Sequence, residues 1–305
     1  MAPTIRTGFA GKPGRRGRIG TSSFSTLLTV TEAAIPVVLA LNALDPAGMT
    51  GLLADTQTLA VHGCHVTGVA TAYLEADSEQ VFEAEAADAE QVDARIRAIL
   101  EDMPVAAMSI AGLARAETVS VLAEILSDYP DLPLVLAPVL LAEEEEHEDD
   151  LLGALTDLLL PRSDLLIVSP FVARHLVQEE ESAPLDLEAR LTRWSSQLAS
   201  LGAEDLLITG EQAATREVIH HLYHGGKLIR RDSWPRPPER IRGSDDLLAA
   251  ALTAQIAHGT PLEEAVYQAG HYARYALEAA YRPGMGACTP WRLPAPPEGE
   301  SVPAD

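Results

Sequence analysis

The sequence predicts an α/β protein in which a mostly parallel central sheet is covered by helices on both faces. Three observations support this fold class. The chain has 305 residues, of which 47% are hydrophobic, enough to build a full core. From residue 36 onward, short apolar runs that suit buried strands alternate with helical patterns of ten or more residues. No apolar run in the sequence reaches the ~18 residues of a membrane span. Strands separated by such helices pair in parallel, so both faces of the sheet must be covered.

The individual elements follow from local patterns along the chain. Apolar runs predict strands at residues 36–42, 65–73, 105–110, 132–137, 165–169, 206–209, 217–223 and 227–231. Helical patterns cover residues 51–62, 87–101, 116–127, 151–160, 171–178, 187–201, 246–258 and 261–281. The helix at 87–101 is the clearest, because Val92, Ile96 and Leu100 recur at helical spacing. The last two strands flank a Gly-Gly turn and are expected to form a hairpin.

The two ends of the chain differ from its middle in composition. Residues 1–31 contain arginines, a lysine and regularly spaced glycines but no acid, and we expect a disordered basic tail. An arginine-rich targeting peptide is the alternative, whereas a secretory signal would need an apolar stretch after the basic part. Residues 32–281 form the expected domain. Residues 282–305 are rich in proline and are expected to be irregular.

The overall charge and the cysteine content limit the possible partners and compartment. The formal net charge is -23, which makes nucleic acid an unfavourable partner because like charges repel. Cys64 and Cys288 are the only cysteines in the sequence, and two thiols so far apart form no metal or redox motif. We therefore expect a cytoplasmic protein in a reducing environment.

The stretch RGSDDLLAAAL at residues 242–252 carries the strongest chemical signal. Gly243 permits a backbone conformation that other residues avoid, and Ser244 and Asp245 are good N-cap residue types before a run of strong helix formers. Such a turn directs several backbone N–H groups and the positive end of a helix dipole at one spot, which suits a phosphate. Asp246 would lie beside that spot as a candidate general base. An ordinary capped helix is the alternative interpretation.

Several further strings occur in a characteristic order: DPAGMTGLLAD at 45–55, VATA at 69–72, APVL at 137–140, DDLL at 149–152, LLP at 159–161, ITG at 208–210, GSDD at 243–246 and LEEAV at 262–266. In order and spacing they resemble motifs of the hydroxymethylpyrimidine and phosphomethylpyrimidine kinases of thiamine biosynthesis. The resemblance covers about residues 36–280. It implies a three-layer ribokinase-like fold, ATP as co-substrate with Mg²⁺, a small pyrimidine substrate and a homodimer.

The resemblance also implies a role for individual residues. Asp45 and Asp55 would bind the pyrimidine substrate, and Asp246 would activate its hydroxymethyl group. The register of this last match rests on counting: Gly259 follows Asp246 by thirteen positions, as the family pattern requires, whereas it follows Asp245 by fourteen.

The remaining implied roles concern phosphate and nucleotide. Gly243 and Ser244 would form the anion hole that cradles the transferring phosphate. Thr209 and Gly210 would lie near the ATP phosphates. No protein-bound metal site is expected: histidines at 62 and 65, and at 220, 221 and 224, could suggest one, but no cysteine or carboxylate spacing supports it.

The chain departs from the family pattern at several site positions. Asp245 replaces a glycine of the anion hole, where a carboxylate would repel phosphate unless it turns away or binds a cation. Ala137 replaces an aspartate. An acidic run at 143–150 replaces the family's lid segment, and either a solvated mobile loop or a divalent-cation site would explain it. The other replaced positions are Ala76, Gly112, Phe171 and Arg174.

These departures leave three functional hypotheses. The first is ATP-dependent phosphorylation of a hydroxymethylpyrimidine-type primary alcohol or its monophosphate. The second is a catalytically inactive relative that keeps Asp55 and binds a pyrimidine or thiamine precursor as a sensor or partner subunit. The third is a kinase for a different alcohol, which the changes at Ala76 and Gly112 would permit.

Overall fold

The computed structural model describes residues 35–141, 145–179, 186–212, 216–237 and 239–293. The chain divides into two units, Met1–Ala34 and Ile35–Asp305, and every described residue belongs to the second. The expected tail at 1–31, residues 142–144 of the acidic run and residues 294–305 of the C-terminal segment therefore lie outside the described residues.

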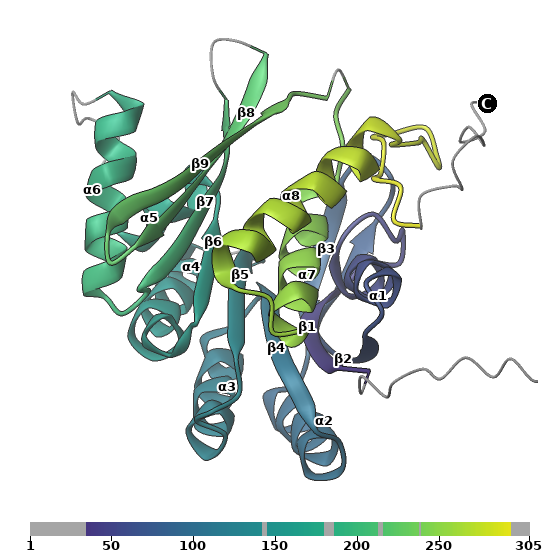
Figure 1. Cartoon of the computed structure of the whole chain (residues 1–305). Coiled ribbons are helices and arrows are strands. Elements are labelled where there is room, and N and C mark those ends of the chain that lie inside the picture. The colour runs from purple at the N-terminus through teal and green to yellow at the C-terminus, as the bar shows by residue number, and fades with distance from the viewer. Residues whose placement is uncertain (1–34, 142–144, 180–185, 213–215, 238, 294–305) are drawn as a thin grey trace, which may run out of the picture. The chain divides into compact units, whose positions relative to one another are not determined.

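Nine strands of the described chain form one sheet in the order β3-β2-β1-β4-β5-β6-β7-β8-β9 (Figure 1). The strands are β1 (Val37–Leu44), β2 (His65–Ala76), β3 (Val81–Ala86), β4 (Val105–Leu113), β5 (Leu134–Leu140), β6 (Leu165–Val168), β7 (Asp205–Gln212), β8 (Glu217–His224) and β9 (Lys227–Pro235). The six inner strands from β2 to β7 run parallel, while β3, β8 and β9 are antiparallel additions at the two edges. The predicted mostly parallel α/β sheet is confirmed.

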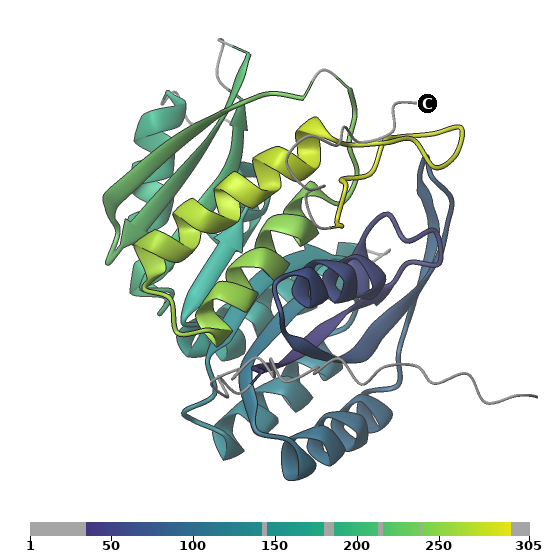
Figure 2. The same cartoon turned by 45° about the vertical axis from the view of Figure 1, so that its right-hand side comes forward.

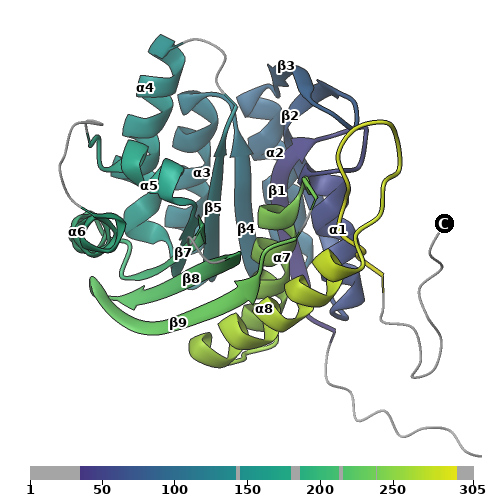
Figure 3. The same ribbon diagram turned by 90° about the horizontal axis from the view of Figure 1, so that it is seen from above.

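Helices cover both faces of the sheet, so the chain forms three layers (Figure 3). They are α1 (Gly51–Val61), α2 (Ala89–Asp102), α3 (Ala116–Asp128), α4 (Glu145–Ala154), α5 (Pro170–Leu176), α6 (Leu187–Ser200), α7 (Ser244–Ala257) and α8 (Leu262–Glu278). Buried residues of α2 to α6 share one apolar cluster with one face of the strands. Buried residues of α1, α7 and α8 pack on the other face. None of the described helices is long and apolar enough to span a bilayer.

Two differences from the predicted elements have local causes. The edge strand β3 is not among the predicted elements. It has the sequence VFEAEA, and its side chains are partly or fully exposed. Such a strand has too few apolar residues to stand out by alternation. The predicted helix at 151–160 begins earlier, because residues 145–150 of the acidic run form the first turns of α4. It then continues as a π-helical turn (Leu155–Leu159) and a 3-10 turn (Leu160–Arg162).

After α8 the chain turns back over the loops that follow β1 and β2 (Figure 2). The backbone N–H of Ala287 donates to Ser78 O at 3.0 Å, and that of Trp291 donates to Ala276 O at 2.9 Å. Isolated bridges join Cys288 to Ile241 and Thr289 to Tyr281. The segment 282–293 is thus irregular in backbone, as expected, but several of its side chains are buried.

We expect the fold to tolerate substitutions least in the large apolar cluster between the sheet and helices α2 to α6. Leu122 of α3 is fully buried in it, so Leu122→Ala should remove about 2–5 kcal/mol of unfolding free energy by leaving a cavity. Urea denaturation followed by circular dichroism measures this loss. Leu187→Ala is the matched control, because Leu187 is 37% exposed at the start of α6 and should lose well under ~1 kcal/mol. Equal losses in the two variants would contradict the assignment of the core.

Candidate active site

The carboxyl ends of the parallel strands open into a pocket of about 430 Å³. Its walls come from the ends of β4, β5, β6 and β7, and from the first turns of α1 and α7. The charged groups of its lining are four carboxylates, Asp55, Glu148, Asp245 and Asp246, with no lysine or arginine among the described lining residues. We call this the acidic pocket. Ligands of open α/β sheets bind at this edge, where the strands end.

Asn42, at the end of β1, holds two of these carboxylates in place. It is 2% exposed, and its Nδ2 donates to Asp55 Oδ2 at 2.9 Å and to Asp246 Oδ1 at 3.0 Å. Its Oδ1 accepts from the backbone N–H of Ala43 and from that of Gly112 at 2.9 Å. One buried amide therefore fixes a carboxylate of α1 and a carboxylate of α7 beside each other. Asn42 is not among the residues predicted for the site, although a polar residue at the end of a predicted apolar strand is a detectable signal.

The packing around Asn42 explains one departure from the family pattern. A Cβ at Gly112 would lie 2.7 Å from Asn42 Oδ1 and 2.9 Å from the Ala43 backbone nitrogen. Any side chain at position 112 would thus disrupt the hydrogen bonds that orient the amide. The glycine of β4 is required by this close approach.

The two paired aspartates differ in their surroundings. Burial, and then the nearby charge of Asp246, raise the pKa of Asp55 well above that of an ordinary aspartate, against opposing effects of Asn42 and Arg292. Asp55 therefore keeps its proton at pH values where an exposed aspartate has lost it. Asp246 Oδ1 accepts from the Gly51 backbone N–H at 3.2 Å as well as from Asn42. A carboxyl group with a raised pKa beside a second carboxyl group is an arrangement common in active sites.

The turn before α7 has the geometry of an anion site. Gly243 is the N-cap, with φ of 82°, in the left-handed region, and no side chain caps the helix. This corrects the expectation that Ser244 or Asp245 caps α7, because both lie inside its first turn. The first-turn N–H groups have no intrahelical acceptor, and the helix dipole adds positive potential there.

A second pocket, of about 550 Å³, lies on the other side of this turn. Its lining includes three arginines, Arg236, Arg240 and Arg274, and we call it the arginine pocket. Gly210 and Ser244 line it, while Thr209 and Asp246 line the acidic pocket. The Nε1 of Trp234, on its wall, is buried without a hydrogen-bond partner among the described residues.

Asp245 lines both pockets and so stands at their boundary. Its side chain remains accessible from the pockets, yet the surrounding protein displaces enough water to raise its pKa to about 6, with the Asp246 charge adding to the effect. A phosphate at the turn would face a carboxyl group that binds a proton more readily than usual. This weakens the repulsion expected from the replaced glycine.

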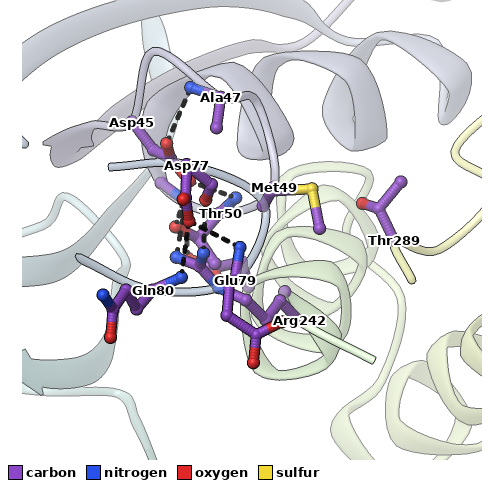
Figure 4. A network of polar contacts seen from close by, with 12 residues as sticks. Asp45, Ala47, Met49, Thr50, Asp77, Glu79, Gln80, Arg242 and Thr289 are labelled. Carbon is purple, nitrogen blue, oxygen red and sulfur yellow. Dashed lines mark hydrogen bonds and ion pairs between the residues drawn. The ribbon is translucent and has the colours of Figure 1, made fainter. Parts of the chain in front are cut away.

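Asp45 lies elsewhere in the site region. It is fully buried, and its carboxylate accepts from the Ala47 N–H at 2.8 Å and from both the N–H and the hydroxyl of Thr50 (Figure 4). Arg242 Nη2 lies 3.9 Å from the same carboxylate. In this arrangement Asp45 shapes the loop that leads into α1 and lines neither pocket. Its predicted contact with substrate stays a prediction.

The other replaced positions divide between the pocket and its surroundings. Ala137 and Phe171 line the acidic pocket, and Arg174 lies over the Phe171 ring at 5.8 Å. Of the acidic run, Glu148 reaches the pocket lining from α4. Across the described residues, no three His, Cys, Asp or Glu side chains are grouped so as to hold a metal ion.

Solved structures share this fold. A Bacillus subtilis pyridoxal kinase in complex with ADP superposes with a TM-score of 0.76 at 19% identity, covering 84% of this chain and 97% of that one. A phosphomethylpyrimidine kinase from Clostridium difficile superposes with a TM-score of 0.63 at 21% identity, covering 78% of this chain and 98% of that one.

Sequence comparison gives the family. The family model described as phosphomethylpyrimidine kinase matches residues 45–291. The hydroxymethylpyrimidine/phosphomethylpyrimidine kinase of Rhizobium meliloti is 29% identical to this chain, over 82% of this chain and 93% of the relative. The kinase of the same name from Streptomyces coelicolor is 30% identical, over 82% of this chain and 92% of the relative. The chain therefore belongs to the phosphomethylpyrimidine kinase family. The predicted family, fold and phosphotransferase class are confirmed.

Gly243 is predicted to be irreplaceable in the turn. A Cβ there would overlap the Met49 carbonyl oxygen and the Arg292 guanidinium, so Gly243→Ala combines backbone strain with a clash. It should lose about 2–4 kcal/mol of stability in urea denaturation. Gly259→Ala is the matched control, since Gly259 has a φ of 76° with nothing within 4 Å of a new Cβ and should lose about 1 kcal/mol. Equal losses in the two variants would mean that the close approach of Met49 and Arg292 to residue 243 does not affect stability.

Asp245 is predicted to make stability depend on pH. Its folded-state pKa of about 6 exceeds the ordinary value of 3.8, so the folded state binds the proton more tightly than the unfolded chain. Stability is therefore lost as pH rises through this window, and Asp245→Asn should abolish that loss. The melting temperatures of variant and wild type should coincide near pH 4 and separate by pH 7, with the variant higher. Exposed Asp157→Asn should show no such divergence.

Proposed function

We propose that the chain transfers the γ-phosphate of ATP to a primary alcohol on a hydroxymethylpyrimidine-type ring. The observation that carries the proposal is the position of the α7 turn between the two pockets. Asp245 lines both, Asp246 lines the acidic pocket and Ser244 lines the arginine pocket. A donor in one pocket and an acceptor in the other would meet at the free N–H groups of this turn.

The chemistry assigned to the turn needs little covalent participation by the protein. Asp246 would accept the proton of the alcohol while the alcohol oxygen attacks the γ-phosphorus, and the bond from the γ-phosphorus to the bridging oxygen would break to release ADP. The first-turn N–H groups behind Gly243 and Ser244 would stabilise the charge on the transferring phosphate. Asn42 would keep the Asp246 carboxylate aimed at the hydroxyl, because its Nδ2 already bonds that carboxylate.

ATP would be the donor, held at the arginine pocket, where Arg236, Arg240 and Arg274 would contact its phosphates. Arg240 is paired with Glu79 and Arg274 with Glu278, and Glu239 and Glu278 also line this pocket, so part of the positive charge is already offset. Thr209 and Gly210, at the end of β7, would lie near the phosphates. Magnesium would enter with ATP as part of the co-substrate and offset its charge beside the acidic pocket. A *Staphylococcus aureus* pyridoxal kinase of the same fold has been solved with AMP-PCP and pyridoxal.

The acceptor would be a neutral, hydrogen-bonding ring. The acidic pocket is otherwise lined largely by apolar groups such as Ile110, Pro138 and Val172, which suit a flat heteroaromatic ring. Protonated Asp55 can accept a hydrogen bond from an amino group and donate one to a ring nitrogen. Asp45 would contribute to substrate binding through the loop that it orders. The curated relatives named as hydroxymethylpyrimidine/phosphomethylpyrimidine kinases support this ring class.

The cellular setting belongs to the same proposal. Cys64 and Cys288 are both free thiols, which suits a reducing cytoplasm. The formal charge of -23 disfavours nucleic acid as a partner. We propose a homodimer, on the family resemblance.

The test is release of ADP by the purified protein with Mg-ATP and hydroxymethylpyrimidine. Asp246→Asn should lower kcat by about 10²–10⁴, the usual range for loss of a general base, while leaving pyrimidine affinity within a few-fold. Asp157→Asn, on the exposed π-helical turn, is the control and should match the wild type. Calorimetry measures pyrimidine and nucleotide binding in parallel.

Each outcome separates one of the initial hypotheses. Pyrimidine binding without nucleotide binding or turnover would reject the kinase and leave a ligand-binding relative. Turnover with another primary alcohol but not with the pyrimidine would reject the substrate class only. Turnover that survives Asp246→Asn would show that a different group accepts the proton.

A further inference from the structure

Arg242, the residue before the Gly243 turn, joins its own loop to the loops that follow β1 and β2 (Figure 4). Its side chain is 12% exposed, and its Nη1 donates to Asp77 O in the turn between β2 and β3 at 2.7 Å. Its Nη2 lies 3.9 Å from Asp45 Oδ2 in the loop before α1. One side chain therefore links the entry of α7 to the entry of α1 and to the edge of the sheet.

Both groups that Arg242 contacts are held in place by hydrogen bonds of their own. Asp45 is fully buried, and donors within its own loop bind its carboxylate. The Asp77 side chain orders the turn between β2 and β3, because its Oδ1 accepts from two backbone N–H groups of that turn, at 2.7 and 2.9 Å. The guanidinium thus contacts two loops that are already ordered, and it can fix the position of its own loop against them.

The C-terminal segment holds the backbone of Arg242 at the same place. The backbone N–H of Arg242 donates to Cys288 O at 2.9 Å. Two positions earlier, the N–H of Gly286 donates to Ser78 Oγ, in the turn between β2 and β3, at 3.0 Å. A Cβ at Gly286 would lie 2.5 Å from the backbone of that turn, so the contact is close. The backbone bonds of the segment and the side chain of Arg242 therefore fasten the same junction.

This junction decides where the Asp246 carboxylate lies. Asp246 is in the first turn of α7, which starts directly after Gly243. Its Oδ1 accepts from Asn42 Nδ2 at 3.0 Å and from the Gly51 N–H at 3.2 Å. These two bonds cross from α7 to β1 and to α1, so they require the entry of α7 to keep its position relative to the entry of α1. The contacts of Arg242 connect those two entries.

We propose that Arg242 is a positioning residue of the active site: it holds the entry of α7 against the loops after β1 and β2, and so keeps the Asp246 carboxylate at its hydrogen-bond donors. Arg242 lines neither pocket and would touch neither the alcohol nor the phosphate. Its effect on turnover rests on the proposed kinase function, whereas its effect on the contacts of Asp246 concerns the protein alone. The two effects can therefore be tested separately.

The first test follows the Asn42 side chain by NMR and needs no activity. Asn42 is the only asparagine in the sequence, so protein labelled with ¹⁵N at the asparagine side chain gives one NH₂ pair. Asp246→Ala removes the acceptor and defines the position of the pair without this bond. Arg242→Gln should move the pair towards that position, because the carboxylate withdraws. Arg242→Lys keeps a charged donor and should leave the pair near its wild-type position.

Arg97→Gln is the matched control for the NMR test. Arg97 of α2 also has two carboxylate partners, each at 2.7 Å, but it lies on the opposite side of the sheet from α7. Its loss should leave the Asn42 pair unmoved. An unmoved pair in folded Arg242→Gln would overturn the positioning role, whatever the melting temperature of that variant.

A second variant decides the question if Arg242→Gln does not fold. Asp77→Ala removes an exposed side chain that orders the turn whose carbonyl accepts from Arg242. It should move the Asn42 pair in the same direction as Asp246→Ala, by a smaller amount. An unmoved pair in Asp77→Ala would then contradict the proposal.

The second test is ADP release with Mg-ATP and hydroxymethylpyrimidine. A displacement of ~1 Å costs a catalytic group much of its effect, so Arg242→Gln should lower kcat by about 10- to 100-fold. The KM for the pyrimidine should change by less than about five-fold, because Asp55 keeps its bond to Asn42. Arg242→Lys should recover most of the lost kcat, and Arg97→Gln should match the wild type.

The kinetic outcomes separate the positioning role from the kinase proposal. A higher KM with unchanged kcat in Arg242→Gln would overturn the positioning of Asp246, and so would a loss of kcat that Arg242→Lys does not relieve. Absence of turnover in the wild type would reject the kinase proposal, and the NMR test alone would then decide the role of Arg242.

Discussion

The arrangement of the site depends on one buried amide. Asn42 lies near the end of β1, with its Nδ2 bonded to a carboxylate of α1 and to a carboxylate of α7, and with its Oδ1 bonded to the backbone of β4. These groups lie up to 204 positions apart along the chain. A buried amide left unpaired would cost several kcal/mol, so each partner constrains the others. The absence of a side chain at Gly112 follows from the same constraint, because a Cβ would displace the amide oxygen.

The electrostatics of the site follow from placing acids at the end of a sheet. Asp55 is pushed towards its neutral form by burial and by Asp246, and Asp245 by burial and by the same neighbour. Close carboxylates cannot all ionise freely, so their protonation states separate. Asp246 Oδ1 accepts hydrogen bonds from Gly51 and Asn42. The pocket thus contains two carboxyl groups, Asp55 and Asp245, that bind a proton more readily than an exposed aspartate does.

Much of the fold was predictable because its signals are local. Apolar runs at 105–110 and 132–137 and the helical spacing of Val92, Ile96 and Leu100 indicate elements that need only their own sequence to be recognised. The π-helical turn at Leu155–Leu159 and the edge strand Val81–Ala86 were not predictable, because tertiary packing and edge pairing decide them. The family resemblance likewise implied that Asp55, Thr209 and Asp246 would share a site, and all three line one pocket.

The sequence by itself determined the family, the parallel sheet and the identity of the glycine turn, because these depend on motif order and short-range pattern. Only the tertiary structure decided that Asn42 bridges two carboxylates, that Asp245 stands between two pockets, that Asp45 bonds to its own loop and that Arg292 reaches the turn from the end of the chain. Such contacts join residues distant in sequence, and their strength depends on burial. Hydrogen-bond geometry and desolvation arise only when the chain is folded, so no local pattern can encode them.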